Sequence, residues 1–227
     1  PNARKQWMSA TYKIGIFGDS FSNLRAKNQD YLQWWEYAHQ QMHGTEITNH
    51  GVAGSSLYYT WRKFHEHQHK YDKIILCGTE SSRLWLPHLP KEWNCEHIHG
   101  MHHFDPNFVN NPPVETDDVK MIRDALQVYF EYIVNDQEAR DRAKLQVDDM
   151  RRKRPDLLYL PCFDASDGPN DYIPLITISE LDGRAAMRHD KRANHLNDTN
   201  NRILGDKIVK WLSTNEFNME IKDFSTK

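Results

Sequence analysis

Two short runs of consecutive apolar residues constrain the fold of this chain more than any other feature. Residues 12–18 read YKIGIFG and residues 72–78 read DKIILCG, and both runs end in glycine. Contiguous apolar residues of this kind are typical of strands in a parallel sheet that is covered on both faces. We therefore predict two buried strands, of which the second is central in its sheet.

Helical and extended patterns alternate along the rest of the chain. Apolar residues at helical spacing predict helices, and short runs rich in β-branched or aromatic residues predict further strands. The predicted helices cover 28–43, 56–67, most of 116–152 and 198–215, and the predicted extended segments cover 45–54, 157–163 and 172–178. This order predicts a three-layer, doubly wound parallel α/β sheet, in which ligands bind beyond the carboxyl ends of the strands.

The chain length of 227 residues suits a single large domain. We expect that domain to cover 9–227, after an N-terminal extension at 1–8 that takes no part in the fold. Residues 86–116 contain five prolines among histidines and asparagines. A stretch of this composition predicts a long irregular insertion, which is a candidate lid or pocket wall.

Charge and cysteine usage bear on the kind of partner and the compartment of this protein. The formal net charge of −3 argues against the basic surface of a nucleic-acid-binding protein. Three cysteines far apart in the sequence suit a reducing compartment. With no apolar stretch of roughly 20 residues and no secretory signal, we expect a soluble cytoplasmic protein with neither a membrane nor a nucleic-acid partner.

Four short motifs lie where the predicted strands end or the last helix begins. They are GDSFS at 18–22, NHGVAGSS at 49–56, GTESS at 78–82 and NHLND at 194–198. Their order and placement resemble the four sequence blocks of the SGNH (GDSL-like) hydrolases, over most of residues 12–212. The segment DKRANHL at 190–196 is similar to bacteriophage-encoded members. The resemblance implies a flavodoxin-like sheet that carries a serine nucleophile, a histidine base and an oxyanion hole.

The resemblance assigns roles to individual residues. Ser20 would be the nucleophile and His195 the base that takes its proton, because a serine hydroxyl attacks well only when a base accepts that proton. The backbone amides of Ser20 and Gly54 would donate to the oxyanion of the tetrahedral intermediate. Alternatively, Ser20 and Gly54 are turn residues without a catalytic role. The corresponding alternative for His195 is a polar residue near the start of the last helix.

Glu80 departs from the family pattern. It occupies the position where the family places an asparagine that donates to the oxyanion. An ionised carboxylate there repels the developing charge, so Glu80 helps only if it is protonated or is turned away toward a cation such as Arg83. A further hypothesis pairs Glu80 with Arg192, since each replaces a family residue with an opposite charge.

The acid of the triad is the second departure. The family places an aspartate three residues before the histidine, where this chain has Arg192. Asp190 is the residue that we assign to orient His195. Asp164, or a dyad supported by a backbone carbonyl, is the alternative, because the acid chiefly fixes the orientation and tautomer of the imidazole.

The thirteen histidines also suggest a metal site. His97 and His99, completed by Cys95 or His103, would form a ligand set that zinc accepts. The spacing matches no compact zinc motif, so we favour solvated loop histidines, including the group at 65–69 at a helix end, and we assign no metal and no cofactor.

These observations predict a serine ester hydrolase, either an esterase or a carbohydrate O-deacetylase, that works through an acyl-enzyme. Its substrate would be a small acyl ester or an O-acetylated glycan. The alternative is a catalytically silent SGNH-like binding or structural module, in which Glu80 and Arg192 mark lost chemistry.

Overall fold

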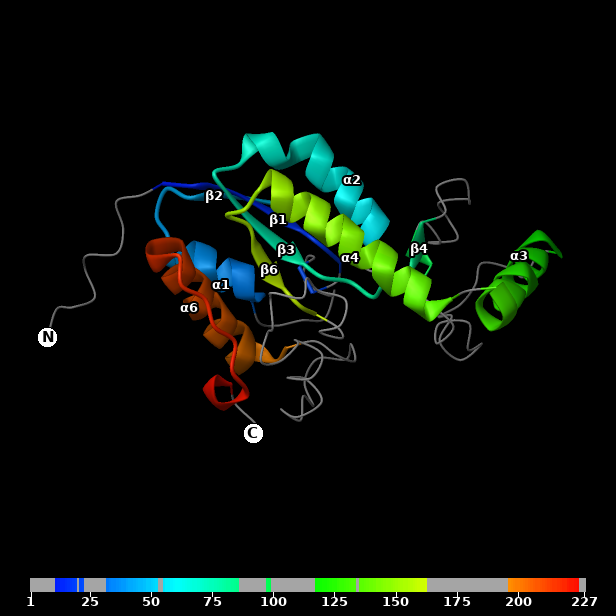
Figure 1. The fold of residues 1–227 in the computed structure, drawn as a ribbon. Helices are drawn as coiled ribbons and strands as arrows, with labels where there is room; N and C mark the ends of the chain where they lie inside the picture. The colour runs from blue at the N-terminus through cyan, green and yellow to red at the C-terminus, as the bar shows by residue number, and fades with distance from the viewer. Residues whose placement is uncertain are drawn as a thin grey trace, which may run out of the picture.

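A computed structural model gives the fold, and Figure 1 shows it as a ribbon. The residues that the structure describes are 11–19, 21–22, 32–52, 55–85, 97–98, 117–133, 135–162 and 196–224.

Four parallel strands form the central sheet. They lie in the order β2 (Glu46–Asn49), β1 (Lys13–Phe17), β3 (Lys73–Cys77) and β6 (Leu158–Leu160). The chain starts at β1, moves outward to β2 and then crosses back to β3, so the strand order reverses between β1 and β3. The prediction of a doubly wound parallel sheet in a flavodoxin-like order is confirmed.

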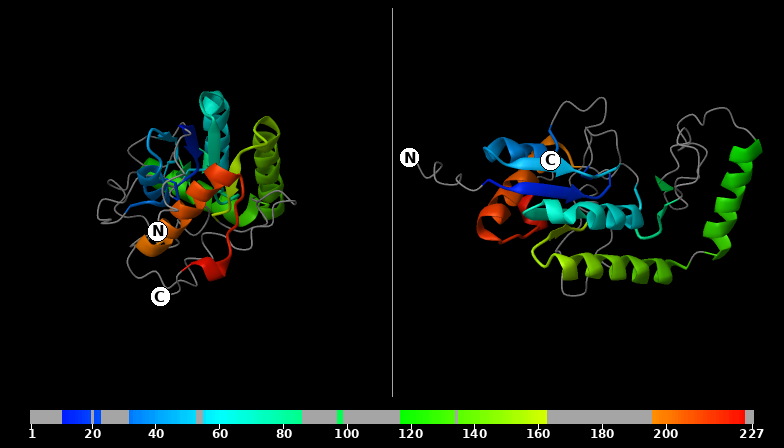
Figure 2. Two further views of the ribbon diagram at one scale, coloured as in Figure 1. Left: turned by 90° about the vertical axis from the view of Figure 1, so that its left-hand side faces the viewer. Right: turned by 90° about the horizontal axis from the view of Figure 1, so that it is seen from above.

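Two pairs of helices cover the two faces of this sheet (Figure 2). The helices α1 (Trp34–Gln41) and α6 (Asp198–Thr214) pack on one face. The other face carries α2 (Leu57–His67), followed by the short η2 (Gln68–Lys70), and α4 (Asp136–Lys153). A 3-10 turn, η7 (Ile221–Asp223), follows α6.

Side chains of the central strand alternate between the two cores. Ile75 and Cys77 of β3 belong to the cluster under α1 and α6, and Ile74 and Leu76 belong to the cluster under α2 and α4. All four are at most 1% exposed. Burial on both faces explains why the strand is a continuous apolar run rather than an alternating one.

The region between β3 and β6 differs from the sequence prediction in two ways. Within the expected irregular insertion, β5 (His97–Ile98) is a short strand that pairs antiparallel with β4 (Leu84–Trp85), just before the insertion. The expected helical stretch is divided into α3 (Asp117–Val128), a π-helical turn at Tyr129–Ile133 and α4. Asn135 caps α4, because its Oδ1 accepts from the amides of Gln137 and Glu138 at 3.0 and 3.2 Å.

The helix α3 stands apart from the sheet and its helices (Figures 1 and 2). Of the apolar residues that the sequence places at helical spacing over 121–133, Met121 of α3 and Ile133 of the π-helical turn are 62% and 64% exposed, and neither belongs to a core cluster. Among the helices of the described residues, none combines the length and apolarity that crossing a membrane requires.

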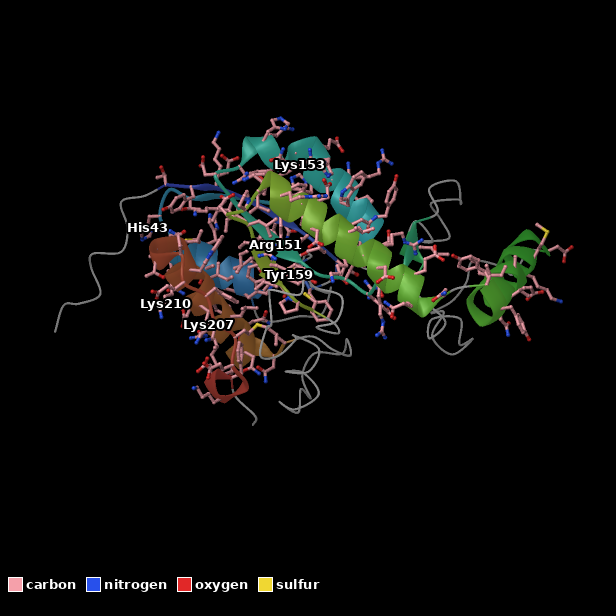
Figure 3. All side chains as sticks on the ribbon, viewed as in Figure 1. His43, Arg151, Lys153, Tyr159, Lys207 and Lys210 are labelled. Carbon is pink, nitrogen blue, oxygen red and sulfur yellow. The ribbon has the colours of Figure 1, made fainter. Side chains whose placement is uncertain are left out.

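Basic residues occupy the last turn of α4. Figure 3 labels Arg151 and Lys153 in its last turn. Arg154 then turns back to the sheet, where its guanidinium donates to the carbonyls of Gln68, Tyr71 and Asp72, each at 3.0 Å. Arg154 therefore joins α4 to the segment that enters β3 at the amino edge of the sheet.

Two histidines of the 65–69 group are only partly solvated, with side chains 25% (His65) and 17% (His67) exposed, and both have partners within the fold. His65 lies 2.7 Å from the carboxylate of Asp149 on α4. His67 stacks on His50, with 4.6 Å between ring centroids, and His50 stacks in turn on Phe17 at 4.8 Å. These side chains tie the end of α2 to α4 and to the residue after β2.

The stacked position holds His50 neutral. Burial, and to a lesser degree the nearby charges of His67, Lys63 and Lys70, lower the pKa of His50 to about 4 against the opposing effect of Glu66. The unfolded chain binds a proton at this histidine below pH 6.5, whereas the folded chain does not until about pH 4. The stability contributed by neutral His50 is therefore complete above pH 6.5 and is lost as the pH falls toward 4.

We expect the free energy of unfolding to fall by about 1–2 kcal/mol through this group between pH 7 and pH 4.5, since the ring is only partly buried. The variant His50→Phe retains a ring to stack on Phe17 but cannot titrate, so its stability should depend less on pH by that amount. Urea unfolding of both proteins across this range measures the difference, with His43→Gln, at an exposed turn, as the control. Parallel profiles for the wild type and His50→Phe would contradict the assignment.

Candidate functional site

The candidate site lies at the carboxyl ends of β1 and β3, where the strand order reverses. In sheets of this class the crevice at such a reversal is where ligands bind. Asp19 follows β1, and Thr79, Glu80 and Arg83 follow β3. Of the site residues that the sequence predicts, Glu80 is described, and Ser20, Gly54, Asp190 and His195 lie outside the described residues.

Asp19 is the centre of a buried polar network. One oxygen of its carboxylate accepts from Nη1 of Arg83 at 2.5 Å and from the hydroxyl of Thr79 at 3.0 Å. Its other oxygen accepts from the backbone amide of Phe21 at 3.1 Å. The side chains of Asp19 and Arg83 are 0% and 5% exposed. A carboxylate so buried is stable only with a paired cation and further donors, and this network supplies both.

The loop after β2 is fastened to the same network. The amide of Val52 and the hydroxyl of Ser55 both donate to the carbonyl of Gly18, at 3.2 and 3.0 Å. The carbonyl of Ser55 lies 3.4 Å from Nη1 of Arg83 and 3.1 Å from the Thr79 hydroxyl. The residues that flank Gly54 in sequence therefore contact the loops after both β1 and β3.

Close packing of these loops requires glycine at two positions. A Cβ atom on Gly51 would lie 2.1 Å from Oγ of Ser22, and one on Gly18 would lie 2.6 Å from Cβ of Cys77. Asn49 joins the same two loops, since its Oδ1 accepts from the amide of Gly51 at 2.8 Å and its Nδ2 donates to the carbonyl of Ser22. The glycines that the sequence places after β1 and β2 thus permit the loops to touch.

Glu80 pairs with Arg83, which is one of the two arrangements that the sequence leaves open. Its Oε2 lies 3.5 Å from Nε of Arg83, and its Oε1 accepts from the hydroxyl of Ser82 at 3.1 Å. The side chain remains 28% exposed. Arg192 lies outside the described residues, so its pairing with Glu80 stays a prediction.

Three hydrogen bonds connect the loop after β1 with the start of α6. The indole of Trp34 donates to the carbonyl of Phe21 at 2.9 Å, and the backbone amide of Trp34 donates to Oδ1 of Asn201 at 2.9 Å. Nδ2 of Asn201 then donates to the carbonyl of Leu196 at 2.7 Å. Trp34 and Asn201 are each 1% exposed, and Phe21 and Leu196 belong to one apolar cluster.

The cysteines below this edge are not nucleophiles. Cys77 and Cys162 are free and buried. Burial, with Cys77 alongside, raises the pKa of the Cys162 thiol well above its ordinary value. A buried thiol of this kind is inert, since the thiolate is the reactive and metal-binding form.

Within the part of the chain that the structure describes, no group of three or more histidine, cysteine or acidic side chains is arranged to hold a metal ion. Of the candidate metal ligands, only the backbone of His97 is described, and Cys95, His99 and His103 lie outside. Asp164, the alternative acid, lies outside as well.

The fold and the site together define a three-layer α/β protein with a charged, hydrogen-bonded centre at the reversal point of a parallel sheet. No protein-family model and no curated protein matches this sequence. Among solved structures, one similar chain is a Desulfitobacterium hafniense DCB-2 protein described as lipolytic and of the G-D-S-L family. The match has 12% identity, a TM-score of 0.37, and covers 87% of this chain and 98% of that chain. At these values it carries no argument about what this chain does, nor does it support a bacteriophage origin.

Proposed function

We propose that this chain is a serine ester hydrolase of the SGNH type. The observation that carries the proposal is the hydrogen-bonded connection from Phe21 through Trp34 and Asn201 to Leu196. Ser20 immediately precedes Phe21, and His195 immediately precedes Leu196. The connection supports a pairing of the two because it fastens the immediate neighbours of a nucleophile and a base that are far apart in sequence.

Hydrogen bonds between the loops after β1 and β2 are the evidence for the proposed oxyanion hole. Gly18 accepts hydrogen bonds from Val52 and Ser55, which flank the segment that contains Gly54. An oxyanion hole needs two amides held at fixed positions, because donors that are already oriented stabilise the developing charge without reorganisation. Loops packed closely enough to require Gly18 and Gly51 suit that requirement.

The proposed reaction has two steps. Ser20 Oγ bonds to the acyl carbon while His195 takes its proton, and the amides of Ser20 and Gly54 receive the oxyanion. The ester bond then breaks, and the alkoxide leaves with the proton from His195. Water then attacks the acyl carbon while His195 takes its proton, the bond to Ser20 Oγ breaks, the carboxylic acid leaves, and Oγ recovers the proton from His195. Asp190 would orient the imidazole of His195, and no metal or cofactor takes part.

The substrate class that we propose is a small acyl ester or an O-acetylated glycan. The test of the proposal is reaction with a serine-directed phosphonate, followed by intact mass and mapping of the adduct. A single adduct on Ser20, together with hydrolysis of p-nitrophenyl acetate, is the expected result. No adduct and no turnover would overturn the proposal.

The alternative, a silent SGNH-like module, rests on the carboxylate of Glu80. Its contacts with Arg83 and Ser82 favour a retuned site, because a paired carboxylate repels a nearby oxyanion less than a free one. We expect Glu80→Asn to change kcat for p-nitrophenyl acetate by less than about tenfold, since removing one oxyanion donor costs at least a hundredfold and Glu80 supplies none. Steady-state kinetics measure the effect, with Glu80→Gln as the matched variant. A large gain of activity from a feeble wild type would favour the silent module.

A further inference from the structure

We propose that Arg83 is a positioning residue that holds the loops of the proposed nucleophile and oxyanion hole in their working arrangement. The inference rests on the proposed function and deepens it. Arg83 lies outside the four sequence motifs, three residues after Glu80.

One nitrogen of Arg83 contacts the loops that follow β1, β2 and β3. Nη1 lies 2.5 Å from the carboxylate of Asp19, 3.4 Å from the carbonyl of Ser55 and 2.7 Å from the hydroxyl of Thr79. Asp19 in turn accepts from the amide of Phe21. The side chain of Arg83 therefore acts on the residues before and after Ser20, and on the residue after Gly54.

The same guanidinium also forms an ion pair with Glu80. Its Nε atom lies 3.5 Å from Oε2 of Glu80 without a hydrogen bond at Nε, while Nη1 donates to Asp19. A planar guanidinium presents donors in fixed directions, so one arginine can hold two carboxylates at a set separation. Arg83 would thus keep the Glu80 carboxylate away from the oxyanion while it orders the loop of Ser20.

Lysine cannot reproduce this arrangement. Its ammonium group is a point charge on a flexible stem, which balances the buried charge of Asp19 but does not provide the fork. A role limited to charge balance would therefore survive Arg83→Lys, whereas a positioning role would not.

The experiment measures the rate of phosphonate labelling, the kcat and KM for p-nitrophenyl acetate, and the urea unfolding of Arg83→Lys. Misplacement of reacting groups by an ångström can cost about a hundredfold in rate. We expect Arg83→Lys to fold, to label about 10- to 100-fold more slowly at the same serine, and to lose kcat with KM nearly unchanged.

The matched control is Arg154→Gln. Like Arg83, Arg154 makes three polar contacts to other segments, but it donates to three backbone carbonyls at the amino edge of the sheet. It should lose stability and yet label within about twofold of the wild type, since that edge lies far from the proposed chemistry.

A second variant separates charge from position. Asp19→Asn/Arg83→Gln leaves no uncompensated buried charge, so it should fold and still label slowly. Wild-type labelling rates in both Arg83→Lys and the double variant would overturn the positioning role and leave the proposed function intact. A wild type that takes no label at Ser20 would overturn the proposed function, and the positioning role with it.

Discussion

Replacing Ser20 with alanine is expected to lower kcat for p-nitrophenyl acetate by at least about a thousandfold and to abolish phosphonate labelling. The reason is that the acyl-enzyme cannot form without Oγ, so that only the oxyanion donors and substrate binding remain to assist water. Removing the nucleophile of a serine hydrolase costs at least this much in kcat. Stopped assays at high enzyme concentration, with intact mass after phosphonate treatment, measure both effects.

The motif GDSFS supplies its own matched control, because it contains a second serine. The hydroxyl of Ser22 donates to the carbonyl of Asp19 at 3.0 Å, and that carbonyl also accepts from the amide of Ser22 at 3.1 Å. Ser22→Ala therefore leaves no buried acceptor without a donor and should retain labelling. If Ser20→Ala keeps its activity, or if the adduct maps to Ser22, the assignment of the nucleophile is wrong.

The sheet could be predicted from sequence because its signal is local. A strand that is buried on both faces has to be apolar at every position, and Ile74, Ile75 and Leu76 show this directly. The carboxyl edge then follows from the order of elements, without any contact being known. This is why Glu80 was expected beside the end of β3, where the structure has it.

Helix boundaries were harder to predict, because tertiary contacts set them. The sequence prediction starts the first helix at residue 28, whereas the structure begins it at Trp34. Leu32 and Gln33 are not helical, and the Gln33 amide is instead bonded to the carboxylate of Glu36 at 2.8 Å. The amide of Trp34 is satisfied by Asn201 on α6, a partner that no local pattern reveals.

The site was predictable only in part for the same reason. Glu80 and Arg83 lie one helical turn apart in sequence, so their pairing could be proposed from spacing. Arg83 and Asp19 are separated by 64 residues, and Trp34 and Asn201 by 167. Such contacts depend on the topology of the whole sheet, which brings together residues that are far apart in sequence.

Asn201→Leu is expected to destabilise the protein by about 2–4 kcal/mol, because leucine fits the volume but removes the acceptor of the buried Trp34 amide and the donor that Asn201 directs at the Leu196 carbonyl. The same change should lower kcat by about 10- to 100-fold, since it releases the segment that carries His195 from the segment that carries Ser20. Urea unfolding and p-nitrophenyl acetate kinetics measure the two effects separately.

Gln41→Leu is the matched control for Asn201→Leu, since Gln41 joins the same two helices. Its Nε2 donates to Asp206 at 2.6 Å, but both side chains are exposed. An exposed hydrogen bond can be replaced by water, so Gln41→Leu should cost no more than about 0.5 kcal/mol and leave kcat unchanged. Equal losses of kcat in the two variants would mean that helix packing as a whole, rather than the connection through Asn201, sets the activity. If Asn201→Leu loses stability but keeps its kcat, the hydrogen-bonded connection does not position Ser20 and His195, and the argument for their pairing fails.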